Sequence, residues 1–289
     1  MIHASVNKRF IFLAILSIIL PKIFAQNTQL PSWALGEFVR PIDLPIIVPN
    51  SESKFYCPMR KQIVKWEESD TFNPAAVVKD GKVYVLYRAE DNSAVGIGER
   101  TSRIGLAESS DGIKMTRRNK PVMYPNEDNM KIYDWPGGCE DPRVCQTENG
   151  LYVMTYTSWN RKTPRLCIAT SKDLVNWQKH GPAFAKAYRG RFKDMACKSG
   201  SIVTKLKDDK LVIAKIKGNY LMYWGENQVN MATSKDLINW EPLLEKNGDL
   251  KAAMHPRKGY FDSAPTECGP PALLTDKGIL LLYNGKNSK

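Results

Sequence analysis

Beyond residue 25 the sequence has no long apolar run, so no later segment predicts a helix that spans a bilayer. Histidine is scarce, with three in the chain, and no two cysteines form a Cys-x2-Cys pair. These absences argue against a zinc site, and we expect no metal and no other cofactor. No amphipathic segment of about 10–15 residues separates the strand-like runs, which argues against an α/β fold.

The N-terminus carries the one strongly apolar segment. Lys8 and Arg9 precede an apolar run over residues 10–20, and Ala25 stands before a polar glutamine. A run this short cannot cross a hydrocarbon core of roughly 30 Å as a helix. The pattern predicts a secretory signal peptide over residues 1–25, with a buried N-terminal helix as the alternative. We therefore expect a secreted or periplasmic protein without a stable membrane span.

Positive charge is spread along the chain without a dense cluster. The formal charge is +12, from 42 basic and 30 acidic residues, and removing the signal peptide leaves +9. Lysines are interleaved with acids, as in residues 205–210, and no nucleic-acid motif is present. We interpret the charge as a solvated, lysine-rich surface and expect no nucleic-acid partner.

The mature chain keeps six cysteines, too few for a disulfide scaffold of this length. An exported protein could oxidise them, so buried free thiols and one or two bridges are equally open. The six are Cys57, Cys139, Cys145, Cys167, Cys197 and Cys268.

A Ser-x-Asp element occurs three times, each time after a short apolar run. The copies cover residues 109–115, 171–177 and 234–240, and their starts are 62 and 63 residues apart. Serine and aspartate side chains bond their own backbone in turns, so each copy predicts a strand followed by a tight turn. The last two copies end in Trp177 and Trp240, which we expect to pack between sheets.

A hairpin element repeats out of phase with these turns. Residues 73–87, 142–156, 199–213 and 270–283 each read as strand, turn and strand, with Asp-Gly, Asn-Gly or Asp-Asp near the turn. A period of about 63 residues with roughly four strands per repeat is typical of β-propeller blades.

The copies do not complete a ring, because four hairpins accompany only three Ser-x-Asp turns. We therefore expect an all-β propeller over residues 71–289 that stops after the start of its fourth blade and lacks a fifth. Residues 26–70 would form an N-terminal extension that packs on the propeller. The alternative is a four-bladed ring that residues 26–70 close.

Polar residues recur where inner strands begin or end, and these positions border the channel of a propeller. Pairs of carboxylates with separated pKa values are the tools of glycoside cleavage, whereas an ion-pair network closing the channel is the equally weighted alternative. Tyr87, Trp159 and Trp224 could stack on sugar faces. The polar positions are Asn73, Arg88, Asp91, Glu140, Asp141, Arg143, Lys198, Glu226, Asp262 and Glu267.

Five motifs resemble glycoside hydrolase family 130, the β-mannoside phosphorylases and β-mannosidases. They occupy residues 72–76, 86–91, 138–143, 171–177 and 267–271, and the likeness runs from about residue 70 to the C-terminus. The Glu-Asp-Pro-Arg element within the third motif is the most specific, whereas other five-bladed glycosidases share the Ser-x-Asp turns. The resemblance implies a five-bladed β-propeller.

The resemblance also implies inverting chemistry on terminal β-mannosides. It makes Asp141 the general acid, and in the hydrolytic branch it makes Glu226 and Glu267 the pair that holds and deprotonates water. We expect Glu140 to raise the pKa of Asp141 and Arg143 to face the sugar. Matching positions for the mannose subsite are Asn73, Arg88, Asp91, Arg143, Lys198 and Asp262.

Three functions stay open. The first is an exported, inverting exo-β-mannosidase acting on β-1,2-linked mannosides of glycans. The second is a β-mannoside phosphorylase, which uses phosphate and needs no base. Against it stand the predicted export and Asn284, where phosphorylases of the family often have histidine. The third is a non-catalytic propeller that binds glycans.

Overall fold

The computed structural model describes residues 36–264 and 266–287. The chain divides into two compact units, residues 1–41 and residues 42–289. The described part of the first unit, residues 36–41, has no regular secondary structure. The predicted signal peptide lies outside the described residues. Among the residues that are described, no helix is long and apolar enough to cross a bilayer.

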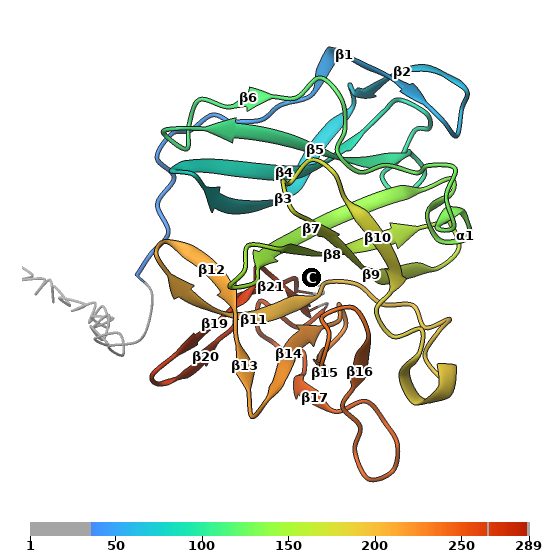
Figure 1. The fold of residues 1–289 in the computed structure, drawn as a ribbon. Helices are drawn as coiled ribbons and strands as arrows, with labels where there is room; N and C mark the ends of the chain where they lie inside the picture. Colours follow the sequence, from blue (N-terminus) through green and yellow to red (C-terminus); the bar gives the residue numbers. More distant parts are fainter. Residues whose placement is uncertain (1–35, 265, 288–289) are drawn as a thin grey trace, which may run out of the picture. The chain divides into compact units, whose positions relative to one another are not determined.

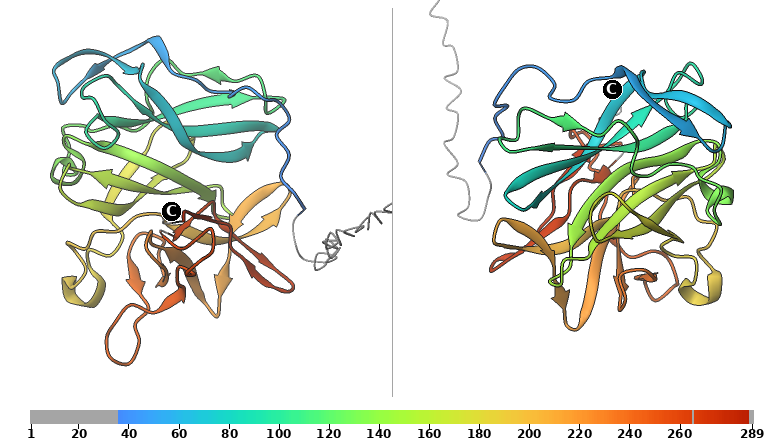
Figure 2. Two further views of the ribbon diagram at one scale, coloured as in Figure 1. Left: turned by 180° about the vertical axis from the view of Figure 1, so that it is seen from behind. Right: turned by 45° about the horizontal axis from the view of Figure 1, so that its top comes forward.

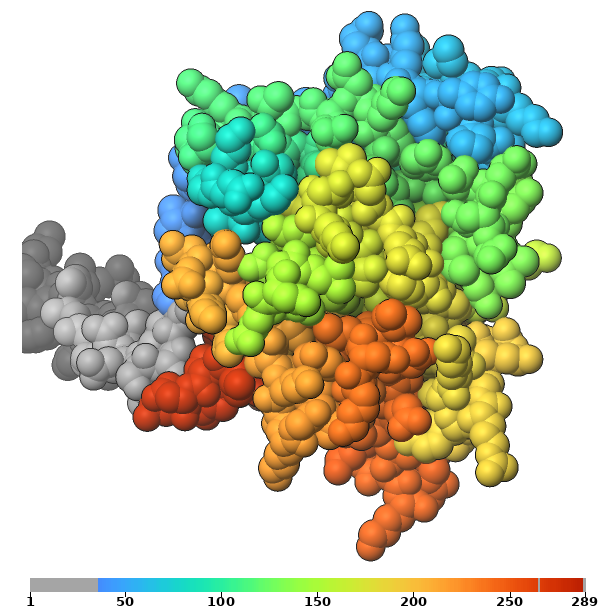
Figure 3. All heavy atoms as spheres, in the orientation of Figure 1, coloured from blue at the N-terminus to red at the C-terminus, as the bar shows by residue number. Residues whose placement is uncertain are grey.

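Residues 42–289 form an all-β structure, as the sequence predicts (Figure 1). Among the described residues its helices are one α-helical turn and one 3-10 turn, α1 (Lys131–Asp134) and η1 (Ala187–Gly190). The described strands form an N-terminal pair, three antiparallel groups and a C-terminal hairpin, and side chains fill the spaces between the ribbons (Figure 3).

The first group contains four strands that pair in chain order. Its first hairpin turns at Asp80 and Gly81, which both have positive φ, so Lys79 pairs with Lys82 as in a tight two-residue hairpin. This confirms the predicted hairpin. The strands are β3 (Asp70–Lys79), β4 (Lys82–Glu90), β5 (Ser102–Ser109) and β6 (Thr116–Arg117).

The second group repeats this antiparallel order. Its strands are β7 (Gly138–Gln146), β8 (Tyr152–Trp159), β9 (Pro164–Ser171) and β10 (Gln178–Pro182).

The third group departs from the repeat, because an inserted hairpin divides its second strand. The first strand of the group, β11, pairs with β12 at one end and with β14 at the other. The strands are β11 (Ser201–Lys207), β12 (Lys210–Ile213), β13 (Lys215–Ile216), β14 (Asn219–Trp224), β15 (Val229–Ser234), β16 (Trp240–Pro242) and β17 (Ala252–Met254).

A C-terminal hairpin corresponds to the predicted fourth copy. Its two arms pair as β19 with β20 and, nearer the ends of the hairpin, as β18 with β21. The strands are β18 (Thr266–Cys268), β19 (Ala272–Thr275), β20 (Gly278–Leu280) and β21 (Tyr283–Gly285).

The N-terminal strands β1 (Asn50–Cys57) and β2 (Gln62–Glu67) pair only with each other in the described part of the chain. Phe55 and Trp66 of this pair cluster with Tyr87 and Ala89 of the first group. Within the described residues they therefore add no strand to the C-terminal hairpin, as a four-bladed ring would require.

The first strands of successive groups meet near the centre of residues 42–289 (Figure 2). Short parallel pairings join neighbouring groups, at Ser102 of β5 with Gly138 of β7, at Val212 of β12 with Gln146 of β7, and at Val203 and Thr204 of β11 with Ala272 and Leu273 of β19. Gly138 has φ of 112°, and a Cβ there would lie 2.0 Å from the carbonyl oxygen of Ser102, so only glycine permits this approach. The all-β class is confirmed, while the count of five blades stays a prediction.

The three Ser-x-Asp segments adopt one local structure. Asp173 Oδ1 accepts hydrogen bonds from the backbone N–H groups of Val175 and Asn176 at 2.8 and 2.7 Å. Asp111 and Asp236 accept the equivalent pairs of hydrogen bonds. The turn prediction is thus confirmed in all three places, each at the end of the third strand of its group.

The repeat tryptophans and most cysteines are partly or fully buried. Trp240 is 1 % exposed and Trp177 is half-buried, and each indole donates to a backbone carbonyl three residues earlier. All six cysteines are free thiols, five of them buried. Of the two alternatives left open, the structure has free thiols.

Candidate active site

Three polar residues near the starts of inner strands have left-handed backbone. Asn73, Asp141 and Ser199 have φ of 45°, 52° and 60°. At the first two the strand register shifts, which marks a bulge in β3 and another in β7. Non-glycine residues seldom adopt this conformation, and bulges beside active sites redirect side chains. The bulges at Asn73 and Asp141 therefore lie at equivalent places in the first strands of two groups.

Asp141 is buried, with 8 % of its surface exposed. Asn73 Nδ2 donates to its Oδ1 at 2.8 Å, and Arg88 Nη1 donates to the same oxygen at 3.1 Å. Within the described residues no hydrogen bond falls on Oδ2. Asp141 is thus anchored through one oxygen and keeps the other for a further partner.

Arg88 lies among three carboxylates. Besides Asp141, its Nη2 lies 2.6 Å from Glu90 Oε1 and 3.0 Å from Glu140 Oε1, and its guanidinium covers the ring of Phe72. Burial raises the pKa of Glu140 to about 7, helped by the charge of Asp141 and opposed by Arg88. Arg88 is shared among three carboxylates, with Arg100 3.8 Å from Glu90, so a proton on Glu140 near neutral pH lowers the negative charge of the cluster.

Glu267 is held by two residues that are far from it in sequence. Arg143 Nη2 donates to its Oε1 at 2.9 Å, and Ser199 Oγ donates to the same oxygen at 2.7 Å. No hydrogen bond to Oε2 occurs in the described parts of the chain, and the Glu267 side chain is 33 % exposed. Glu267 therefore repeats the arrangement of Asp141, with one anchored oxygen and one available.

Arg143 bonds to the C-terminal hairpin, and its contact with a sugar stays a prediction. Its Nε donates to the carbonyl of Gly269 at 2.7 Å, and Nη2 donates to the carbonyl of Cys268 at 2.6 Å as well as to Glu267. These contacts direct the guanidinium toward the C-terminal hairpin, because the carbonyls at the end of β18 point at it.

A cavity of about 550 Å³ brings several predicted residues together. Its walls come from the first and second groups, from Leu211 of the third group and from the C-terminal hairpin. Asn73, Asp141, Arg143, Glu267 and Asn284 line it. Both carboxylates with one available oxygen therefore border a single space.

Glu226 and Lys198 do not line this cavity. Their side chains form an ion pair at 3.9 Å, and the N–H of Gly225 donates to the carbonyl of Lys198 at 3.0 Å. Lys198 is followed by Ser199, which binds Glu267. The charge of Lys198 also lowers the pKa of Glu140, so it reaches the Arg88 cluster electrostatically. Glu226 is 41 % exposed and accessible to solvent.

Asp91 and Asp262 lie apart from these carboxylates. Asp91, 2 % exposed, pairs with Arg103 at 3.0 Å. Asp262, fully buried, accepts hydrogen bonds from Arg257 Nε and Tyr283 Oη, both at 2.9 Å. Neither lines the cavity, and sugar binding by either residue stays a prediction.

Two of the three aromatic residues expected to stack on sugars belong to the core. Tyr87 is 1 % exposed and donates to Glu67 at 2.7 Å. Trp224 is 2 % exposed and its ring lies 4.6 Å from that of Phe184. Their side chains alternate into buried faces, so that expectation is wrong for both. Trp159 is half-buried and donates to the carbonyl of Gly98.

The sequence places Glu90 in the motif of residues 86–91, but it gave no sign of Ser102 and Ser199 as partners of the predicted residues. The contact of Glu90 with Arg88 follows from strand geometry, since residues two apart in a strand share a face. In the residues that the structure describes, no three His, Cys, Asp or Glu side chains are placed to hold a metal ion.

The family profile described as β-1,4-mannooligosaccharide phosphorylase matches residues 52–289. The chain belongs to glycoside hydrolase family 130. It is 30 % identical over 247 residues to the 1,2-β-oligomannan phosphorylase of Thermoanaerobacter sp. strain X514, covering 84 % of this chain and 69 % of that protein.

Two relatives with solved structures have a higher sequence identity to this family-130 chain. A glycosyl hydrolase from Bacteroides ovatus is 57 % identical, with a TM-score of 0.88 over 90 % of this chain and 73 % of that one. The description of another solved structure says that family 130 of mannoside phosphorylases contains glycoside hydrolases that target β-1,2-mannosidic linkages in Candida mannan. It is 60 % identical, with a TM-score of 0.88 over 90 % of this chain and 72 % of that one.

Proposed function

We propose that this protein is an exported, inverting exo-β-mannosidase that acts on β-1,2-linked mannosides. The observation that carries the proposal is the pair Asp141 and Glu267. Both side chains line one cavity, and each is fixed through a single carboxylate oxygen while its second oxygen is available. Inverting glycosidases need two such carboxyl groups, one as acid and one as base.

Asp141 is the proposed acid. It donates a proton to the leaving glycosidic oxygen, directly or through a mannose hydroxyl. Arg88 and Asn73 fix its Oδ1 and so set the direction of Oδ2. Burial raises the pKa of neighbouring Glu140 to about 7, so this residue can hold a proton beside Asp141 near neutral pH.

Glu267 and Glu226 are the proposed base, and together they position the attacking water. Glu267 is oriented by Arg143 and Ser199, and Glu226 is accessible beside Lys198. Water activated here attacks the anomeric carbon on the face opposite the leaving group, so the configuration inverts. The separation expected for an inverting acid and base is about 6.5–9.5 Å.

A phosphorylase is the second candidate, favoured by the names of the curated relatives, which include the 1,2-β-oligomannan phosphorylase. A phosphorylase must hold phosphate with uncommitted basic groups. Here Arg143 bonds to Glu267 and three carbonyls, and Lys198 pairs with Glu226. Two carboxylates at this place disfavour a phosphate anion and suit a water molecule.

The test is product analysis on β-1,2-mannobiose, with and without phosphate. We expect mannose of inverted configuration, released at a rate that phosphate does not change. Glu267→Gln and Glu226→Gln should each lower the rate at least about a hundredfold. Glu245→Gln, an exposed site elsewhere, is the matched control.

Each other outcome selects another function. If mannose 1-phosphate forms only when phosphate is present, and both glutamine variants keep their activity, the protein is a phosphorylase and not a hydrolase. Binding of mannobiose without any turnover, by a protein shown to be folded, would leave the non-catalytic glycan-binding propeller.

A further inference from the structure

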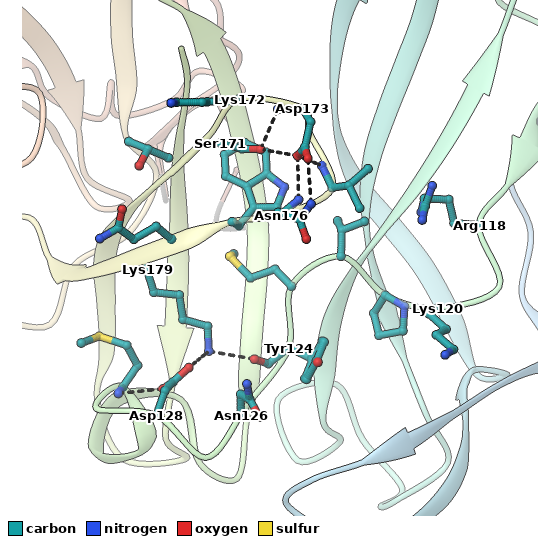
Figure 4. A pocket seen from close by; sticks show the side chains of 18 of the residues that line it. Arg118, Lys120, Tyr124, Asn126, Asp128, Ser171, Lys172, Asp173, Asn176 and Lys179 are labelled. Carbon is teal, nitrogen blue, oxygen red and sulfur yellow. Dashed lines mark hydrogen bonds and ion pairs between the residues drawn. The ribbon is translucent and has the colours of Figure 1, made fainter.

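A second hollow, of about 940 Å³, lies between the outer strands of the first and second groups (Figure 4). One wall is the segment between β6 and α1, and the other is the end of β9 with the turn that leads to β10. Its lining shares no residue with the cavity at Asp141. The hollow is therefore separate from the candidate active site.

This hollow continues into a neighbouring one of about 630 Å³ along the first group. Arg118, Lys120, Asp173 and Val175 line both. We call the two together the outer groove. An elongated groove suits a chain-like ligand better than a compact molecule.

The acidic side chains of the outer groove are already engaged. Asp173 accepts the hydrogen bonds of its turn. Asp128 accepts the N–H of Met130 and lies 3.3 Å from Lys179. Lys179 in turn is 8 % exposed and lies 2.6 Å from the fully buried Asp134. Lys179 compensates part of the charge of Asp128 and Asp134, whereas Asp173 keeps its negative charge, because its hydrogen-bond donors are neutral.

Three exposed cations remain, namely Arg118, Lys120 and Lys172. No ion pair involves them within the described residues. Arg118 acts electrostatically on Glu108, but that carboxylate accepts a hydrogen bond from Lys82 at 3.0 Å. Figure 4 places Arg118 and Lys120 on one side of the hollow and Lys172 on the other. A ligand in the groove would therefore meet positive charge from both walls.

Neutral polar groups and partly exposed rings lie between these cations. Asn126, Asn129, Asn176 and Gln178 offer amides, and half-buried Trp177 offers part of an indole. Amides can donate to and accept from sugar hydroxyls, and aromatic faces can cover apolar sugar faces. The free cations suit phosphate or carboxylate groups.

We propose that the outer groove is an ancillary binding site for an anionic glycan, a saccharide chain carrying phosphate or carboxylate groups. It would hold such a chain on the protein while the separate cavity acts on mannosides. The assignment does not depend on the chemistry at Asp141, because binding in the groove can be measured without turnover.

The test measures direct binding to three probes, in an Asp141→Asn background that prevents their cleavage. The probes are a phosphorylated mannan, polygalacturonate and neutral β-1,2-mannan. The groove variant replaces Arg118, Lys120 and Lys172 by glutamine. Its matched control replaces Lys235, Lys246 and Lys251, all exposed, and Lys235 occupies the place of Lys172 in the third Ser-x-Asp turn.

We expect the groove variant to lose at least about tenfold in affinity for one or both anionic probes, and the control to change less than about twofold. Binding of those probes should weaken as salt rises from about 0.05 to 0.5 M. A response to one anionic probe alone identifies phosphate or carboxylate as the recognised group. Affinity for neutral mannan should not change.

Two results would overturn the proposal. One is that neither anionic probe binds more weakly to the groove variant than to the control. The other is that the affinity of the groove variant for neutral mannan falls as much as its affinity for the charged probes, with no effect of salt. The groove would then bind uncharged sugar. Thermal unfolding of both triple variants must match that of the background protein, since all substituted side chains are exposed.

Discussion

Arg143 and Glu267 stand 124 positions apart in the chain and meet at 2.9 Å. The contact joins the second group of strands to the C-terminal hairpin, and two carbonyl hydrogen bonds from the same guanidinium reinforce it. One side chain thereby orients the proposed base and fastens the segment that carries it.

We therefore expect Arg143→Leu to loosen the C-terminal hairpin and to cost about 1–3 kcal/mol of the free energy of unfolding. Hydrogen exchange should speed up in residues 266–285 and change little in β3 and β4. Arg143→Lys keeps the charge but loses the planar set of N–H donors, so its stability and exchange rates should lie between those of the parent and Arg143→Leu. Unchanged exchange in Arg143→Leu would contradict this role.

Asp141→Asn should fold normally, because the asparagine keeps Oδ1 as an acceptor for Asn73 and Arg88. It cannot donate an acidic proton, so kcat on β-1,2-mannobiose should fall by about 10²–10⁴. Unfolding curves of the variant and the parent should agree within about 1 kcal/mol. A variant that keeps more than a tenth of kcat would remove Asp141 from the role of acid.

Glu140 should make the protein less stable as pH rises. Burial raises its pKa from the usual value of 4.5 to about 7, so between these pH values the folded protein holds a proton that the unfolded chain releases. The free energy of unfolding should therefore fall with pH in this window, by up to about 1.4 kcal/mol per unit.

Glu140→Gln removes this proton, so its stability should vary less between pH 5 and about 7. Urea unfolding at several pH values measures the slope, and exposed Glu245→Gln should keep the parent's slope. Equal slopes in parent and Glu140→Gln would show that Glu140 is ionised throughout the range.

The Ser-x-Asp turns should contribute stability that depends on pH in the opposite sense. Burial raises the pKa of Asp173, but the hydrogen bonds from Asn176, Val175 and Ser171 outweigh burial and hold it below its usual value of 3.8. This stabilisation is complete above the usual value and is lost as pH falls below it.

We expect Asp173→Ala to lower the free energy of unfolding by about 1–2 kcal/mol at neutral pH, as for the loss of a helix cap. Asp236→Ala, in the equivalent turn, should behave alike. The control is Asp194→Ala. The Asp194 side chain is 73 % exposed and pairs with Arg165, so its loss should lower the free energy of unfolding by less than about 1 kcal/mol. Chemical denaturation measures all three, and a harmless Asp173→Ala would contradict the structural role of the turn.

The strands, hairpins and turns could be predicted from the sequence because their causes are local. Asp80 and Gly81 set a two-residue turn through their own φ angles, and each Ser-x-Asp segment bonds to its own backbone. Repetition of these signals at a near-constant period then indicated an all-β fold. The family resemblance pointed to Asp141 and Glu267, which the structure brings to one cavity.

Only the tertiary structure decided how the side chains are used. In the sequence, Tyr87 and Trp224 look like aromatic residues that stack on sugars. Their side chains nevertheless point into the core, because strand pairing fixes which face is buried. Arg143 reaches Glu267, and Ser199 joins it, only because distant strands pack side by side. Contacts between groups depend on packing across the whole molecule, and no spacing within the sequence encodes them.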